Sequence, residues 1–145
     1  MIFRVATREE LPFVLALLAD DGTERAVVTE AHERAFAAIE SDARNEMLVL
    51  VDDDRIVGCL QLTYVPGLGQ GGRDRALVEA VRIRADRRGD GLGAELMGLA
   101  VARARDRGCG LVQLTSNKQR GDAHRFYERL GFARSHEGFK LHLPG

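Results

Sequence analysis

Tryptophan is absent from this chain of 145 residues, and proline (three) and cysteine (two) are scarce. Cys59 and Cys109 lie far apart and show neither the paired spacing of a zinc site nor a disulfide framework. Such cysteines suit a reducing compartment, so we expect a cytoplasmic protein. The four histidines show no metal-ligand spacing either, and we therefore predict no metal site.

Long hydrophobic runs and a surplus of one charge are also missing. No apolar stretch approaches membrane-spanning length, and the N-terminus lacks the apolar core of a signal peptide. A formal net charge of −1 argues against a general nucleic-acid binder. We therefore expect neither a membrane nor a nucleic acid as partner. A chain of this length, 45% hydrophobic and 30% charged, predicts a single globular domain over residues 1–145.

Glycine, by contrast, is abundant, and three of the 16 glycines alternate in one short stretch that follows two arginines. Gly89, Gly91 and Gly93 lie between a strand-like run (76–84) and a helix-like run (92–107). Backbone N–H groups exposed at a helix N-terminus, reinforced by the helix dipole, bind anions such as phosphate. We therefore predict a cradle for a phosphorylated ligand.

The glycine turn has three other interpretations. A dinucleotide-binding fold needs its first glycine directly after a strand and an acidic residue about 20 residues later. Here charged residues intervene, and the next strand ends at Thr115 without a carboxylate. A P-loop needs Gly-Lys-Ser/Thr, which does not follow the glycines. A purely structural turn stays open, because glycine is the ordinary solution to a tight turn.

Hydrophobic periodicity predicts elements in the order β-α-α-β-β-β-α-β-α-β-β. The expected strands are residues 2–5, 47–51, 55–64, 76–84, 111–115, 132–136 and 139–143, and the last two form a hairpin. The first two helices, joined by a polar stretch at 20–24, begin at a capping box of Thr7 with Glu10 and at about Thr29. The others begin at Leu92 and at a cap on Asp122. This order predicts an α+β fold with a mixed sheet of about seven strands and about four flanking helices.

Two residues are candidates for proton chemistry. By the period of two, Glu79 shares a strand face with Leu77, Val81 and Ile83, where burial would raise its pKa towards neutrality and make it a competent base. A bulge or a pairing with an arginine would explain the same pattern. Tyr127 lies on an apolar helix face, which fits a core tyrosine, and its pKa of about 10 would also let it donate a proton at pH 7.

The order of these features resembles the GNAT superfamily of acetyl-CoA-dependent N-acetyltransferases. The turn from Arg88 to Gly93 matches that family's Q/R-x-x-G-x-G/A motif, and residues 78–83 match its fourth strand. Residues 126–132, which read Phe-Tyr-Glu-Arg-Leu-Gly-Phe, match a later helix. The likeness covers most of the chain from Met47 onward. Residues 117–127 with 135–137 are also similar to the aminoalkylphosphonate N-acetyltransferases.

The resemblance implies acetyl-CoA as co-substrate and a primary amine, preferentially a small molecule, as acceptor. It places the coenzyme pyrophosphate on the loop and helix start, at Arg88, Gly89, Gly91, Leu92, Gly93 and Ala94. It places the pantetheine arm on the backbone of Val81 and Ile83. By the same analogy Glu79 is the general base, directly or through water, and Tyr127 is the general acid for the leaving thiolate. Asn117 is a further contact to coenzyme or acceptor, and a homodimer is common among such proteins.

Some features depart from the family or leave alternatives open. Arg120 stands where many members carry an asparagine that contacts the coenzyme, although a guanidinium can bind phosphate instead. The acceptor pocket is expected to come from the second helix, the loop at 66–74 and the final hairpin. A non-catalytic acyl-CoA-binding or sensing module and an acetyltransferase that acts on proteins or peptides are the alternative functions.

Overall fold

The computed structural model describes residues 1–19 and 26–145, so the polar stretch predicted at 20–24 lies outside the described residues. The chain divides into two compact units, Met1–Gln113 and Leu114–Gly145. The first unit holds the glycine turn and almost all of the sheet. The second holds the residues from the end of the last strand to the C-terminus.

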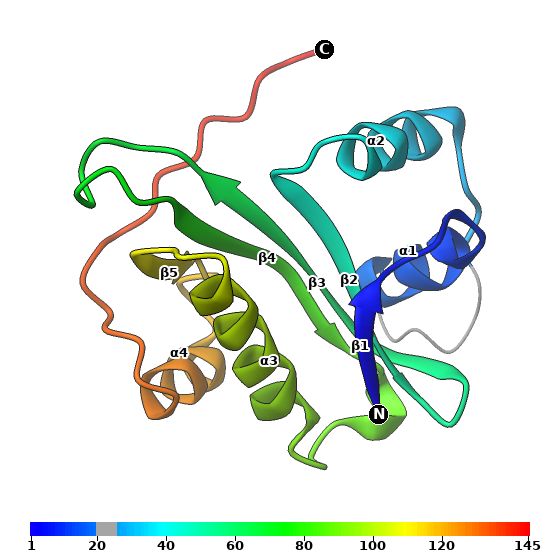
Figure 1. Ribbon diagram of the computed structural model, residues 1–145. Helices are drawn as coiled ribbons and strands as arrows, with labels where there is room; N and C mark the ends of the chain where they lie inside the picture. Colours follow the sequence, from blue (N-terminus) through cyan, green and yellow to red (C-terminus); the bar gives the residue numbers. More distant parts are fainter. Residues whose placement is uncertain (20–25) are drawn as a thin grey trace. The chain divides into compact units, whose positions relative to one another are not determined.

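A five-stranded sheet is the centre of the first unit (Figure 1). Its strands lie in the order β1 (Ile2–Val5), β2 (Asn45–Asp52), β3 (Arg55–Val65), β4 (Arg75–Ile83) and β5 (Leu111–Leu114). The first four are antiparallel neighbours. The Gly110 N–H donates to the Asp74 carbonyl at 2.8 Å, so β5 begins beside the start of β4 and runs parallel to it. The predicted mixed sheet is therefore confirmed.

Four α-helices occur in the described residues, as predicted. In the first unit the turn η1 (Arg8–Glu10) leads into α1 (Leu11–Ala19), followed by α2 (Glu30–Glu40). The turn η2 (Ala85–Arg87) then precedes α3 (Leu92–Asp106), and α4 (Gly121–Arg129) belongs to the second unit. None of these described helices is long and apolar enough to cross a membrane.

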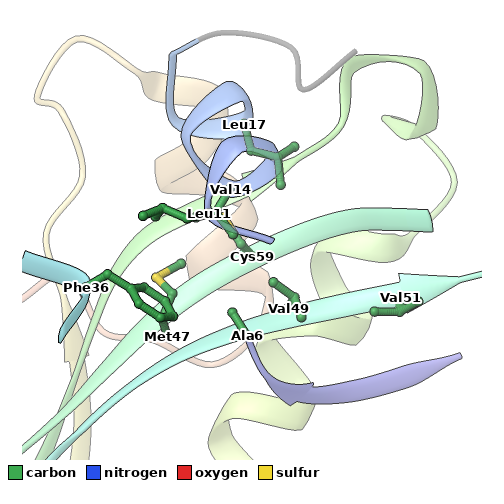
Figure 2. Packing of buried hydrophobic residues seen from close by; sticks show 9 residues of the cluster. All are labelled: Ala6, Leu11, Val14, Leu17, Phe36, Met47, Val49, Val51 and Cys59. Atoms are coloured by element: carbon green, nitrogen blue, oxygen red, sulfur yellow. The ribbon is translucent and has the colours of Figure 1, made fainter. Parts of the chain in front are cut away.

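Apolar side chains fill both faces of the sheet, because alternate residues of a strand point to opposite sides. On one face, Met47, Val49, Val51 and Cys59 pack with Ala6 and with residues of α1 and α2, namely Leu11, Val14, Leu17 and Phe36 (Figure 2). The opposite face of β2 and β3 carries Leu48, Leu60 and Leu62, each without exposed surface. There α3 contributes Leu96 and Met97, which are also buried. We call the first of these the α1–α2 face of the sheet and the second the α3 face.

A polar network fastens the second half of α3 to the sheet. The Glu46 carboxylate of β2 accepts hydrogen bonds from Arg103 Nε at 2.9 Å and from the Tyr64 hydroxyl at 2.6 Å. The Arg103 guanidinium lowers the pKa of Glu46, whereas burial and this carboxylate raise the pKa of Tyr64. Arg107 lies over the Tyr64 ring, 3.9 Å from its centroid. The helix that begins at the glycine turn is thus anchored at its other end.

The prediction of about seven strands was wrong, because residues 132–136 and 139–143 of the second unit form no strands. Phe139, Leu141 and Leu143 alternate as strand residues do, yet they are 93%, 88% and 84% exposed. Alternation identifies residues that can pair, but a strand also needs a partner to complete its hydrogen bonds. The cap predicted at Asp122 was wrong as well: α4 begins at Gly121, and Asp122 pairs with Arg125 inside the first turn.

Candidate active site

A bulge in β4 decides where the candidate base lies. Gln61 of β3 opposes Glu79 and Cys59 opposes Arg82, so two residues of β4, Ala80 and Val81, face Leu60 alone. Ala80 adopts a left-handed conformation with φ of 57°, as the first residue of some bulges does. The extra residue interrupts the period of two. Glu79 therefore does not share a face with Ile83, which corrects the sequence prediction.

Glu79 is exposed rather than buried. Glu79 lies on the α1–α2 face of the sheet. Its partner Gln61 is two residues from Cys59 on β3 and therefore shares a face with Cys59, which belongs to the core cluster there. Among the described residues no arginine, lysine or histidine forms an ion pair with it. The alternative of a bulge is thus confirmed, and the expectation that Glu79 is buried was wrong.

The end of β4 presents backbone groups to the edge away from β3. The Arg84 N–H donates to the Val57 carbonyl of β3 at 2.8 Å, so the backbone groups of Ile83 and Val81 point the other way. Because β5 has four residues and starts beside Asp74, it ends before it reaches them. The Val81 carbonyl accepts from Arg82 Nη1 at 2.9 Å, and the Ile83 carbonyl accepts from Arg88 Nε at 3.1 Å. Because both carbonyls already accept these bonds, an extended ligand can pair with this edge through its N–H groups, or through the carbonyls once the guanidinium groups move away.

The glycine turn leads directly into α3. Gly89 and Gly91 have φ of 87° and 79°, and Gly91 is the N-cap of the helix. The first helical hydrogen bond runs from the Glu95 N–H to the Gly91 carbonyl at 3.2 Å, so the N–H groups of Leu92, Gly93 and Ala94 have no acceptor inside the helix. These donors and the helix dipole fit a pyrophosphate. The positive φ values also satisfy the structural reason for glycine at both positions.

Ion pairs brace this turn from the side. Arg87 binds Asp52 at 2.9 Å and Asp90 at 3.4 Å, which connects the turn to the β2–β3 hairpin. Arg84 binds Asp86 at 2.6 Å. Arg88, the motif arginine, directs Nε towards the end of β4, as described above. The structure thus brings Glu79, Val81, Ile83 and the turn from Arg88 to Ala94 together along one continuous stretch of the first unit.

Tyr127, Asn117 and Arg120 belong to the second unit. Tyr127 is half-buried on α4, and its ring makes edge contacts with Phe126 and Phe132, with centroid separations of 5.1 and 5.9 Å. Asn117 is exposed, and its Oδ1 accepts the Gln119 N–H at 2.9 Å. Arg120 is the exposed N-cap residue of α4. The aromatic contacts fix the ring of Tyr127, whereas Asn117 shapes the turn before the helix.

Neither cysteine is placed for nucleophilic catalysis. Cys59 is fully buried, and burial raises the pKa of its thiol to about 12. Burial also raises the pKa of Cys109. Both thiols are therefore protonated at neutral pH. Within residues 1–19 and 26–145, no group of three or more His, Cys, Asp or Glu side chains could hold a metal ion.

Sequence reasoning missed the polar neighbours of Glu79. Asn45, Gln61 and Thr63 lie on the same face as Glu79 and are hydrogen-bonded to one another. One signal was available in the sequence: Gln61 interrupts the otherwise apolar centre of the strand at residues 56–62. The expected loop at 66–74 is fastened to the end of α3, because Arg73 donates to the carbonyls of Gly108 and Cys109.

A model of the GNAT acetyltransferase family matches residues 11–132. The chain belongs to this family and is an acyltransferase. The match includes β4, the glycine turn, α3 and α4, which are the elements that carry the candidate site residues.

Individual relatives are similar to the chain over nearly its whole length. Aminoalkylphosphonate N-acetyltransferase of Salmonella typhimurium is 30% identical over 136 residues, which are 94% of this chain and 87% of that protein. A crystal structure from Bacillus halodurans, described as a transcriptional regulator, is 44% identical with a TM-score of 0.91, and the alignment covers 98% and 99% of the two chains. An acetyltransferase of Trypanosoma brucei is 29% identical with a TM-score of 0.82, covering 98% and 99%.

Proposed function

We propose that this protein transfers an acetyl group from acetyl-CoA to a primary amine of a small molecule. The observation that carries the proposal is the joint placement of an anion cradle and an open strand edge. The N–H groups of residues 92–94 follow the end of β4 after a turn at residues 84–91, and at that strand end Val81 and Ile83 present their backbone. The cradle would hold the pyrophosphate, and the edge would pair with the amides of the pantetheine arm.

Two side chains are assigned to proton transfer. When bound, acetyl-CoA supplies an acyl group that is activated as a thioester. An alkylammonium has a pKa of about 10, so Glu79 removes a proton, directly or through water, before the nitrogen attacks. As the C–S bond breaks, Tyr127 donates its phenolic proton to the departing sulfur, and the second proton that the nitrogen loses in forming the amide returns to the Tyr127 oxygen, directly or through water. Each such acid or base contributes a factor of about 10² to 10⁴ to the rate. Arg88 and Asn117 are assigned to coenzyme binding, with Asn117 also able to contact the acceptor.

Turnover with a panel of amines tests this proposal. The purified protein is mixed with acetyl-CoA and with 2-aminoethylphosphonate, butylamine, a lysine peptide or a peptide with a free N-terminus, and release of the coenzyme thiol is followed with a thiol-reactive dye. The two buried cysteines keep the background of this assay low. We expect turnover with at least one small amine. Acetylation of the peptides alone would indicate a protein acetyltransferase.

Tyr127→Phe isolates the general acid. We expect kcat to fall by about 10² or more, because the phenolic proton is lost, while the Kd for coenzyme A stays within about twofold. Tyr64→Phe is the matched control, since Tyr64 is the second tyrosine of the chain and its hydroxyl serves the network around Glu46. That variant should lose stability and keep kcat. An unchanged kcat in Tyr127→Phe would exclude the general-acid role.

A second candidate function is a coenzyme-binding sensor without turnover. The observation in its favour is the description of the 44% identical Bacillus halodurans protein as a transcriptional regulator. Tight binding of acetyl-CoA by calorimetry, together with absence of turnover across the whole panel, would support this function over the enzyme. Glu79 and Tyr127, both retained at the family positions, favour the enzyme.

A further inference from the structure

A row of polar side chains crosses three strands on the α1–α2 face of the sheet. Asn45 of β2 opposes Thr63 of β3, and Gln61 of β3 opposes Glu79 of β4. Opposed residues of antiparallel strands have Cβ atoms about 4.5–5.5 Å apart on the same face. Met47, which also opposes Gln61, points into the core beneath α1 and α2 (Figure 2). The polar row therefore borders the apolar core on the same face of the sheet and extends to Glu79, the candidate base.

The hydrogen bonds of this row have a fixed direction. The Asp42 carboxylate can only accept, and it receives the Asn45 amide Nδ2–H at 3.0 Å. Asn45 Oδ1 is consequently turned towards β3, where it accepts the Thr63 hydroxyl at 2.8 Å and Gln61 Nε2–H at 3.4 Å. The Gln61 amide nitrogen therefore donates to Asn45. The amide oxygen, Oε1, points away from Asn45.

Gln61 Oε1 and the two carboxylate oxygens of Glu79 are then three hydrogen-bond acceptors at opposed strand positions on one face. In the part of the chain that the structure describes, neither group has a hydrogen bond or ion pair that uses these oxygens. Arg82, which lies on the same face, directs Nη1 to the Val81 carbonyl instead. Acceptors grouped in this way match a primary ammonium, which has three N–H donors and no acceptor. An alcohol, with one O–H, would leave acceptors unmatched.

We propose that Gln61 binds the acceptor amine, and that Gln61 and Glu79 together form the ammonium seat of the enzyme. This inference rests on the proposed function and assigns a residue to it. The ammonium donates one N–H to Glu79 and a second to Gln61 Oε1. Glu79 takes its proton and the nitrogen gains a lone pair. The nitrogen then turns about the retained N–H···Oε1 bond and presents that lone pair to the acyl carbon, while Gln61 neither gains nor loses a proton.

Two substitutions of Gln61 test the seat in opposite directions. Gln61→Met keeps an unbranched side chain and removes Oε1, so the KM for the amine should rise about tenfold or more, as expected for a lost hydrogen bond to a charged group. The KM for acetyl-CoA should change by less than about threefold. Gln61→Glu adds a negative charge beside the ammonium and should lower the Kd for the amine. Gln113→Met, an exposed glutamine on β5, is the matched control.

Calorimetry with butylamine in the presence of free coenzyme A makes the test independent of turnover. We expect the wild type to bind, Gln61→Met to bind at least about tenfold more weakly, and Gln61→Glu to bind more tightly. Binding that follows this order without turnover would contradict the proposed function and keep the seat. Turnover by the wild type with an unchanged amine KM and Kd in Gln61→Met would overturn the seat alone, as would equal weakening by both substitutions. Absence of any butylamine binding would also overturn it.

Discussion

Ala80 is the residue on which the geometry of β4 depends. Its φ of 57° is rare for a residue with a Cβ atom, and left-handed conformations cost an L-residue about 1–2 kcal/mol. The bulge that it forms keeps Glu79 on the face of Gln61 and puts Ile83 opposite Gly58 on the α3 face. A Cβ at Gly58 would lie 2.9 Å from Ile83 Cδ1, so β3, β4 and α3 are packed closely beyond the bulge. A small side chain at position 80 therefore sets the positions of Glu79 and of the end of β4.

Substitution of Ala80 by valine should disrupt this bulge. A β-branched side chain at positive φ adds strain, so we expect Ala80→Val to lose about 1–3 kcal/mol in the free energy of unfolding by urea denaturation, together with amine turnover. Ala80→Gly is the control: the relief of strain and the extra freedom of glycine in the unfolded chain nearly cancel, and turnover should persist. Equal stability of the valine variant and the wild type would show that the bulge accommodates a branched residue.

At the scale of single residues, the sequence predicted the turn at Gly89 and Gly91 correctly, but it did not predict the strand face and exposure of Glu79. Gly89 and Gly91 alternate in a pattern that has a direct conformational meaning, and both adopt positive φ. Glu79 was placed on a buried face by counting residues in twos, and Ala80 carries no local signal that the count is interrupted. The polar row at Asn45 and Gln61 depends on strand register, which becomes known only when the strands are paired.

At the scale of elements, α3 connects the candidate coenzyme site to the core. Its N-terminus supplies the unpaired N–H groups of residues 92–94, and its far half is held by Arg103 and Arg107 on Glu46 and Tyr64. Leu96 and Met97, both buried, pack on the sheet between these ends. The helix dipole is therefore fixed in direction relative to β4. A ligand at the turn meets donors that are already oriented and lose little entropy on binding.

A negative charge introduced in the first turn of α3 should change the stability of the helix and the Kd for coenzyme A in opposite senses: the helix becomes more stable and the coenzyme binds more weakly. Ala94 is exposed, and Ala94→Asp should stabilise the helix slightly because a carboxylate interacts favourably with the N-terminal dipole. The same charge should repel the pyrophosphate and raise the Kd for coenzyme A about tenfold, as roughly 1.4 kcal/mol of like-charge repulsion would. Ala102→Asp puts the charge at an exposed site in the second half of α3 and should leave the Kd unchanged. Equal Kd values in calorimetry for all three proteins would place the coenzyme elsewhere.

Sequence patterns predicted most of the helices and strands correctly. The two predicted strands that did not form lack the same thing, a neighbouring strand among the described residues. The hairpin at Asp53 and Asp54, both with positive φ, formed where the aspartates between the two apolar strands predicted it. The strands expected at 132–136 and 139–143 did not form. Inside the sheet each strand has a neighbour whose ladder completes its hydrogen bonds, and β2 and β3 also bury both faces. The terminal segment has the alternation of a strand without those contacts, and alternation alone does not stabilise a strand.

At the scale of the molecule, paired carboxylates make stability depend on pH. Arg103 lowers the pKa of Glu46, and Arg4 lowers the pKa of Glu10. A carboxyl group with a lowered folded-state pKa contributes stability that is complete above its unfolded pKa of about 4.3 and is lost as the pH falls through the folded value. We expect the Tm from circular dichroism to fall between pH 5 and pH 3. Glu46→Gln should lower the Tm at pH 7 and reduce that fall, whereas the exposed Glu40→Gln should change neither. A Tm independent of pH below 5 would contradict this account.

The open edge of β4 also has a consequence for solubility. Unpaired strand edges are templates on which a second chain can add a strand, and proteins commonly protect them with charged side chains. Here Arg82 and Arg88 cover the carbonyls of Val81 and Ile83 beyond the end of β5. Another strand could pair there only by displacing two guanidinium groups and bringing its backbone against two positive charges. The same two arginines thus protect this edge of β4 against pairing between chains.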